Sequence, residues 1–281
     1  MMRYAICNET FEGWDHARIC DLVASVGYTG LELAPFTLAP LITEVGPERR
    51  RQLRREAEAS GLQIIGLHWL LAKTTGLHLT SPDPEVRQRT AQYLIGLTRC
   101  CRDLGGELLV FGSPAQRRVP QGYTKAQAAE FALDVFRRVL PVLDECQVRL
   151  CLEPLSPPEA DFLNTCAEAA ELARRLDHPR VCLHLDVKAM TTDEAPRPEL
   201  IRRYAPLTGH FHANDANLRG PGMGDVDFVP IFQALLESGY SGWVSVEVFD
   251  YRPDPETIAR DSLSYMRQCE ARARELMGGR P

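Results

Sequence analysis

The sequence predicts an α/β fold, a (β/α)8 barrel in which each of eight parallel strands is followed by a helix. Short β-branched or apolar runs alternate eight times with longer amphipathic segments along the 281 residues. The segments that follow strands are long and those that precede them are short, which is typical of a barrel with its site at the strands' C-terminal ends. No linker or low-complexity stretch interrupts the alternation, so we expect residues 1–281 to form one TIM-barrel domain.

The elements follow from the change between short apolar runs and helical periodicity. In the first half, strands are expected at 3–9, 30–34, 63–68 and 107–112, and helices at 15–26, 47–60, 83–104 and 125–146. In the second half, strands are expected at 148–153, 181–186, 209–214 and 243–249, and helices at 165–176, 197–204, 228–238 and 255–276. Four glycines stand just after a helix and before a strand: Gly27, Gly61, Gly105 and Gly239. Glycine at this position ends a helix and turns the chain.

Composition excludes several classes of protein. A hydrophobic content of 44% and a net charge of -6, with both signs mixed, disfavour binding to nucleic acid or to an anionic membrane and leave a small molecule as the expected partner. No apolar run approaches the roughly 20 residues that span a bilayer, and MMRYAICNET lacks the pattern of a signal peptide, so we expect a soluble, cytoplasmic protein. The nine scattered cysteines, none in a CxxC pair, are expected to be core thiols.

Four consecutive strands carry potential metal ligands near their carboxyl ends. These residues are Glu153, Asp186, His212 and Glu247. Taken singly, each carboxylate could be a cap or part of an ion pair, and the histidine could be a hydrogen-bonded core residue. In a barrel all four would meet at one mouth. Three carboxylates and one imidazole favour one divalent cation, namely Mn²⁺, Mg²⁺ or Co²⁺, with Zn²⁺ also possible.

Five stretches resemble a known family. They are GLHWLLAKTTGLHLTSPDPEVR, CLEPLSPPEADFLNT, LHLDVKAM, HFHANDANLRGPGMGDVDF and VSVEVF. They resemble the sugar phosphate isomerase/epimerase family of xylose isomerase-like TIM barrels, and within it the ketose 3-epimerases of the D-tagatose 3-epimerase type. The resemblance implies metal ligation by the four residues above, acid/base roles for Glu153 and Glu247, and substrate contacts by Glu159 and Arg219. It also suggests a homo-oligomer, a dimer or a tetramer.

The chemistry of such a site is consistent with that implication. Removing a proton next to a carbonyl creates an enediolate, and a divalent cation stabilises the negative charge as it develops. Epimerisation also needs a base on one face of the carbon and an acid on the other. Glu153 and Glu247, on strands well apart around the ring, could flank a substrate in this way. We therefore expect a metal-dependent sugar isomerase or epimerase, with 3-epimerisation of a ketose or keto-sugar derivative as the first choice.

Further candidates for substrate binding lie in the loops after strands. His68 ends the third expected strand and could contact substrate or an additional metal, or it could be an ordinary hydrogen-bonded histidine. Trp69 and Phe36 could form an apolar wall over a sugar ring, although plain packing is an alternative. Arg117 could hold a hydroxyl, carboxylate or phosphate, and Lys188 could provide a charged contact; for both, a solvated side chain is the alternative.

One departure from the family bears on the substrate. The ketose 3-epimerases have a substrate-contacting histidine three residues after the aspartate of strand six, where this chain has Ala189. Free ketohexoses are therefore expected to be poor substrates. The same metal and carboxylates could instead serve a lyase that eliminates a β-hydroxyl or a glycoside from a keto-sugar or keto-cyclitol. A non-catalytic sugar-binding barrel is disfavoured, because binding alone does not require two carboxylates that flank a metal. The superfamily also contains enzymes of the AP endonuclease IV type, which need a histidine-rich cluster of three zinc ions. This chain has Ala189 and Asp227 where such a cluster would need imidazoles, so a role in DNA repair is not expected.

Overall fold

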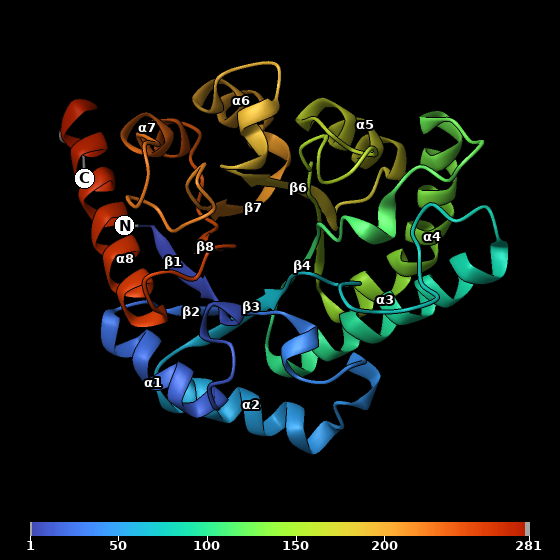
Figure 1. Cartoon of the computed structure of the whole chain (residues 1–281), viewed down its shortest axis with the longest axis horizontal. Coiled ribbons are helices and arrows are strands. Elements are labelled where there is room, and N and C mark those ends of the chain that lie inside the picture. Colours follow the sequence, from blue (N-terminus) through green and yellow to red (C-terminus); the bar gives the residue numbers. More distant parts are fainter. Residues whose placement is uncertain (1, 279–281) are drawn as a thin grey trace.

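The computed structural model describes residues 2–278 and forms a closed barrel of eight parallel strands, which confirms the predicted fold (Figure 1). Each strand pairs with the next along the chain, and β8 pairs with β1 to close the ring. The strands are β1 Arg3–Cys7, β2 Gly30–Leu33, β3 Gln63–Leu67, β4 Leu108–Phe111, β5 Arg149–Leu152, β6 Val181–Asp186, β7 Thr208–Ala213 and β8 Trp243–Val246.

Eight α-helices in the described part of the chain surround the strands (Figure 1). They are α1 His16–Val26, α2 Pro47–Ala59, α3 Pro84–Leu104, α4 Lys125–Cys146, α5 Cys166–Leu176, α6 Arg197–Tyr204, α7 Val229–Glu237 and α8 Pro255–Leu276. Gly27 and Gly105 end α1 and α3 with φ of 108° and 87°, as the sequence predicts. Gln147 and Asp177 end α4 and α5 in the same left-handed region, and sequence reasoning did not identify them.

The inside of the barrel changes from apolar to polar along the strands. At the N-terminal end, Trp243 packs with Ala5 and Ile65. This packing requires glycine at position 30, because a Cβ there would lie 2.7 Å from the Trp243 ring. Nearer the C-terminal ends, buried polar side chains fill the ring: Cys7, Glu32, His184, His210, His212 and Ser245. Barrel interiors are usually filled by branched apolar residues, so this polar layer marks the end of the barrel where a site is expected.

Two expectations about the whole chain can be compared with the structure. All nine cysteines are buried and free, as predicted for core thiols. Within residues 2–278, every helix is too short or too polar to cross a lipid bilayer.

Candidate metal and substrate site

The predicted metal ligands come together at the C-terminal mouth of the barrel. Asp186 ends β6, His212 lies on β7, and Glu153 and Glu247 each lie one residue beyond a strand end. One ligand atom from each of Glu153, Asp186, His212 and also His184 lies within 4.8 Å of the others. Glu247 adjoins this group through His212, with its Oε2 atom 3.1 Å from Nδ1 of the imidazole. The four predicted ligands are therefore neighbours, and His184 is an additional member.

A buried carboxylate on β2 orients His212. Glu32 contacts His212 Nε2 at 3.2 Å and His210 Nε2 at 2.9 Å, and all three side chains are fully buried. Because Glu32 occupies Nε2, the other ring nitrogen, Nδ1, is directed toward Glu247. A carboxylate on one imidazole nitrogen fixes the tautomer and the ring direction of a metal-binding histidine. Glu32 therefore supports His212 as a ligand.

Asp186 is oriented by hydrogen bonds from its own loop and from the neighbouring strand end. The backbone N–H of Ala189 donates to Asp186 Oδ1 at 2.7 Å, and the side-chain amide of Asn214 donates to Oδ2 at 2.5 Å. These bonds leave each oxygen with a further lone pair, so the carboxylate can still coordinate a cation. Ala189, at the position of the family's substrate histidine, thus contributes its backbone to the site.

The electrostatics of this group are those of crowded buried carboxylates. Burial, together with the nearby charges of Glu247 and Asp186, raises the pKa of Glu153 well above its ordinary value. Burial also raises the pKa of Asp186. Burial opposes protonation of His212, but Glu32 and Glu247 raise its pKa well above the usual range. A divalent cation would relieve the repulsion among the carboxylates, so the donor set fits such an ion.

An inner chamber adjoins the candidate ligands. Four of the predicted substrate-binding residues line it together with Glu153 and Glu247: His68, Trp69, Glu159 and Lys188. The Trp69 Nε1–H donates to Glu247 Oε1 at 2.8 Å, and Lys188 Nζ pairs with Glu159 Oε1 at 2.6 Å. The chamber has a volume of about 20 Å³, so it is narrow. The polar side chains that line this narrow chamber therefore lie close to the Glu153 and Glu247 carboxylates.

A larger outer chamber lies beside the inner one and shares Trp69 and Pro114 with it. Its volume is about 310 Å³. Aromatic side chains and polar groups both line it: Phe36, Trp69, Tyr251, Glu9, Glu12 and Gln116. Most of these residues follow β1 to β4, whereas Tyr251 follows β8. Aromatic faces mixed with carboxylate and amide groups suit a polar ring, which has an apolar face and many hydroxyls.

Two predicted substrate contacts lie elsewhere. Arg117 has a fully buried guanidinium, which donates to the carbonyl oxygens of Phe162 at 3.0 Å, Glu153 at 2.7 Å and Leu163 at 2.7 Å. These bonds hold the backbone around Glu153, and the guanidinium cannot reach a ligand without breaking them. Arg219 pairs with Asp250 at 3.2 Å, outside the residues that line the two chambers, and its contact with substrate stays a prediction.

Sequence reasoning missed three polar residues of the site. Glu9 follows β1 and contacts His68 Nε2 at 2.9 Å, whereas Glu32 and His184 lie inside strands. A signal was present for the last two, because each is a polar residue within an otherwise apolar run, GLEL or VCLHLD. Buried polar residues of this kind usually have a specific partner.

A closed (β/α)8 barrel with clustered carboxylates and histidines at its C-terminal mouth is the architecture of a barrel enzyme with a candidate metal centre. Residues 20–269 match the family model described as xylose isomerase-like TIM barrel. The chain belongs to this family, which confirms the resemblance seen in the sequence.

Several characterised proteins are similar to this chain. D-psicose 3-epimerase of Ruminiclostridium cellulolyticum is 28% identical over 250 residues, covering 88% of this chain and 82% of the relative. 3-Dehydro-D-guloside 4-epimerase of Escherichia coli is 31% identical over 134 residues, covering 46% of this chain and 51% of the relative. The solved structure of an L-ribulose 3-epimerase superposes with a TM-score of 0.86 at 21% identity, covering 100% of this chain and 99% of that one. The structural likeness concerns the fold.

Proposed function

We propose that this protein is a divalent-metal-dependent sugar epimerase that moves a proton on a carbon next to a carbonyl. The observation that carries the proposal is the pair of carboxylates, Glu153 and Glu247, which line one chamber from β5 and β8 and adjoin Asp186 and His212. The relative from Ruminiclostridium cellulolyticum, an epimerase by name, supports the same class of reaction. A cation held by these four residues would stabilise negative charge on the substrate oxygens.

The protein's own groups provide the two proton-transfer positions. Glu153 and Glu247 approach the chamber from strands three apart in the ring, so they can address opposite faces of one substrate carbon. Burial, together with Glu247 and Asp186, raises the pKa of Glu153 well above its ordinary value, and a bound cation would act in the opposite direction, so the two effects together set its basicity. The indole N–H of Trp69 fixes the direction of the Glu247 carboxylate. Lys188 and Glu159, joined as an ion pair, would contact substrate hydroxyls.

The outer chamber bears on the choice of substrate. The inner chamber of about 20 Å³ leaves little room, whereas the adjoining space of about 310 Å³ can take part of a larger molecule. We therefore propose a keto-sugar derivative with a second ring or aglycone in preference to a free ketohexose. The relative from Escherichia coli that is named for a 3-dehydro-guloside supports this preference. Among the cations we expect Mn²⁺ or Co²⁺ to serve, since the donors are mostly oxygen with some nitrogen.

A second candidate function, elimination from a keto-sugar, is favoured by His68. This histidine lines the inner chamber and lies 2.9 Å from Glu9. Burial opposes its protonation, but Cys7 and Glu9 raise its pKa well above the ordinary value. A protonated imidazole beside the chamber could protonate a leaving hydroxyl or glycosidic oxygen. This is the group that a lyase needs and that a two-carboxylate epimerase does not.

The two functions can be separated in deuterated water. The Mn²⁺-loaded protein is incubated with free ketohexoses and with 3-keto-glycosides, and the products are followed by NMR. We expect deuterium at the carbon next to the carbonyl, with inversion, in the keto-glycosides and little turnover of D-tagatose or D-fructose. Loss of a hydroxyl or of the aglycone would indicate the lyase. Efficient turnover of the free ketohexoses would contradict the proposed preference for a larger substrate.

Substitutions test the two carboxylates directly. At saturating Mn²⁺, Glu153→Gln and Glu247→Gln should each lower turnover by about 100-fold or more, because the amide keeps the shape but loses the basicity. Asp186→Asn removes a ligand and no base, so excess Mn²⁺ should partly restore its activity. Near wild-type deuterium exchange by both glutamine variants would rule out the two-carboxylate mechanism. Inactivity of only one variant would favour a one-base isomerase or a lyase.

A further inference from the structure

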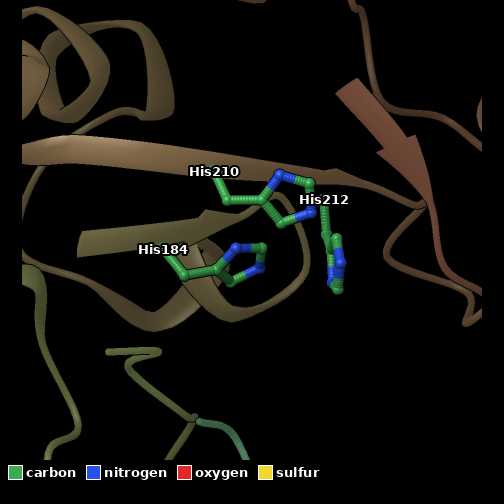
Figure 2. A group of neighbouring side chains, drawn as sticks. All are labelled: His184, His210 and His212. Carbon is green, nitrogen blue, oxygen red and sulfur yellow. The ribbon is translucent and has the colours of Figure 1, made fainter. Parts of the chain in front are cut away.

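His184 has no role in the function proposed above, although it lies at the centre of the polar layer. It is on β6 two residues before Asp186, and successive residues of a strand point to opposite faces, so both side chains face the barrel interior. Figure 2 shows its ring beside those of His210 and His212. The ring centroids of His184 and His212 are 4.1 Å apart, and those of His184 and His210 are 5.2 Å apart.

The two ring nitrogens of His184 make no hydrogen bond within residues 2–278. The side chain is fully buried, and neither Nδ1 nor Nε2 has a hydrogen-bond partner among the residues that the structure describes. A neutral imidazole offers one N–H donor and one acceptor, and buried polar groups of this kind are nearly always satisfied. His210 and His212 differ, because each directs Nε2 to Glu32. The position of His184 therefore indicates an interaction outside the protein's own hydrogen bonds.

The surroundings of His184 suit a cation. Its Nε2 atom lies 3.9 Å from Glu153 Oε1, and one ligand atom from each of Glu153, His184, Asp186 and His212 lies within 4.8 Å of the others. Ligands bound to one ion at about 2.0–2.2 Å can be up to about 4.4 Å apart, so only small side-chain movements are needed.

We infer that His184 is an additional nitrogen ligand of the cation held by Glu153, Asp186, His212 and Glu247, an inference that rests on the metal centre of the proposed function. The site then has two imidazoles in place of one. A second nitrogen ligand raises the affinity for Co²⁺ and Zn²⁺ more than for Mg²⁺, because imidazole suits the former ions better. The centre would therefore discriminate against Mg²⁺ more strongly than a site with a single histidine.

Spectroscopy and binding test this ligand without relying on activity. The full chain, labelled isotopically in histidine and loaded with Mn²⁺, is studied by electron–nuclear double resonance, which counts coordinated imidazole nitrogens. We expect two nitrogens in the wild type and one in His184→Gln. Calorimetry should show that His184→Gln lowers the affinity for Co²⁺ at least about tenfold and lowers that for Mg²⁺ less. The matched control is His16→Gln, which removes a buried histidine on α1 that contacts the Leu53 carbonyl, and it should leave both affinities unchanged.

The outcomes are distinguishable. One coordinated nitrogen in the wild type, with epimerase activity intact, overturns the role of His184 and leaves the proposed function standing. Unchanged Co²⁺ affinity in a folded His184→Gln protein has the same meaning. No binding of Mn²⁺ or Co²⁺ by the wild type overturns the metal centre and with it the proposed function. The nitrogen count of the wild type needs no substitution, so the inference is testable even if His184→Gln fails to fold.

Discussion

Arg117 provides the sharpest distinction between a binding role and a structural one, and Arg117→Met is the perturbation that tests it. Burial lowers the pKa of Arg117 to about 10, so the guanidinium is charged at neutral pH. It donates at 3.0 Å or less to three carbonyl oxygens, those of Phe162, Glu153 and Leu163. Methionine fills similar space but leaves the Phe162 and Glu153 carbonyls without a donor, whereas the Leu163 carbonyl still accepts from the Leu155 N–H at 3.0 Å.

The magnitude follows from the two carbonyls that lose their donor and from the lost bond to the third. Leaving one buried carbonyl unpaired costs about 1–3 kcal/mol. Some of this cost is recovered as the loop relaxes, so we expect the free energy of unfolding to fall by about 3–5 kcal/mol, with a fall in Tm of roughly 10 °C. Because the bonds also hold the backbone at Glu153, kcat should fall as well, whereas a direct substrate contact would chiefly raise KM.

Thermal unfolding and steady-state kinetics of the same preparations are the assays. Arg117→Lys is the matched control, since it keeps the charge, but its single nitrogen cannot reach the three carbonyls that Nε, Nη1 and Nη2 of Arg117 address separately, and it should lie near the methionine variant in stability. A wild-type Tm in Arg117→Met, combined with a raised KM, would refute the structural assignment and restore the binding role.

Two other predictions concern pH and steric space. Glu270 on α8 accepts hydrogen bonds from Tyr4 and Arg274, and although burial opposes its ionisation, these bonds hold its pKa below the ordinary value. The stabilising effect of ionised Glu270 is therefore present above that ordinary pKa of 4.5 and is lost as the pH falls through the depressed pKa. Glu270→Gln should lower the free energy of unfolding by roughly 1–3 kcal/mol at pH 7 and by less in acid. Urea unfolding of both proteins measures this difference, and a difference independent of pH would contradict the prediction. A Cβ at Gly112 would lie 1.8 Å from Glu153 Oε2, so Gly112→Ala must displace that carboxylate. We expect turnover to fall about 100-fold with little change in Tm. Wild-type turnover in this variant would show that the position of the carboxylate is unimportant.

The sequence was sufficient to locate the candidate ligands because their position depends on one rule. In a parallel barrel the strand ends meet at one mouth, so assigning strands assigns the site. Glu153, Asp186, His212 and Glu247 all lie at a strand end or within one residue of it. Their neighbourhood in the structure follows from strand order, which alternation of strands and helices already predicts.

The supporting residues could not be found in the same way, because their roles depend on contacts across the ring or on side-chain direction. Glu32 on β2 contacts His210 and His212 on β7, and Glu32 and His212 are 180 residues apart along the chain. His184 shares a strand face with Asp186, but the lack of a hydrogen-bond partner for its nitrogens in the described part of the chain is a property of the packed interior. Arg117 follows β4 in a loop, where periodicity does not predict whether a side chain turns outward or beneath the chain.

The candidate cation ligands and most of the outer-chamber walls come from different halves of the chain, and this arrangement has an evolutionary consequence. The candidate cation ligands come from β5 to β8, whereas the walls of the outer chamber come mainly from loops after β1 to β4. Substitutions in the first half can therefore change which molecule is admitted while the proton-transfer groups are inherited intact. A mutant library confined to those four loops, with Trp69, Gly112 and Arg117 kept because they hold Glu247 and Glu153, would explore new substrates against a constant chemistry.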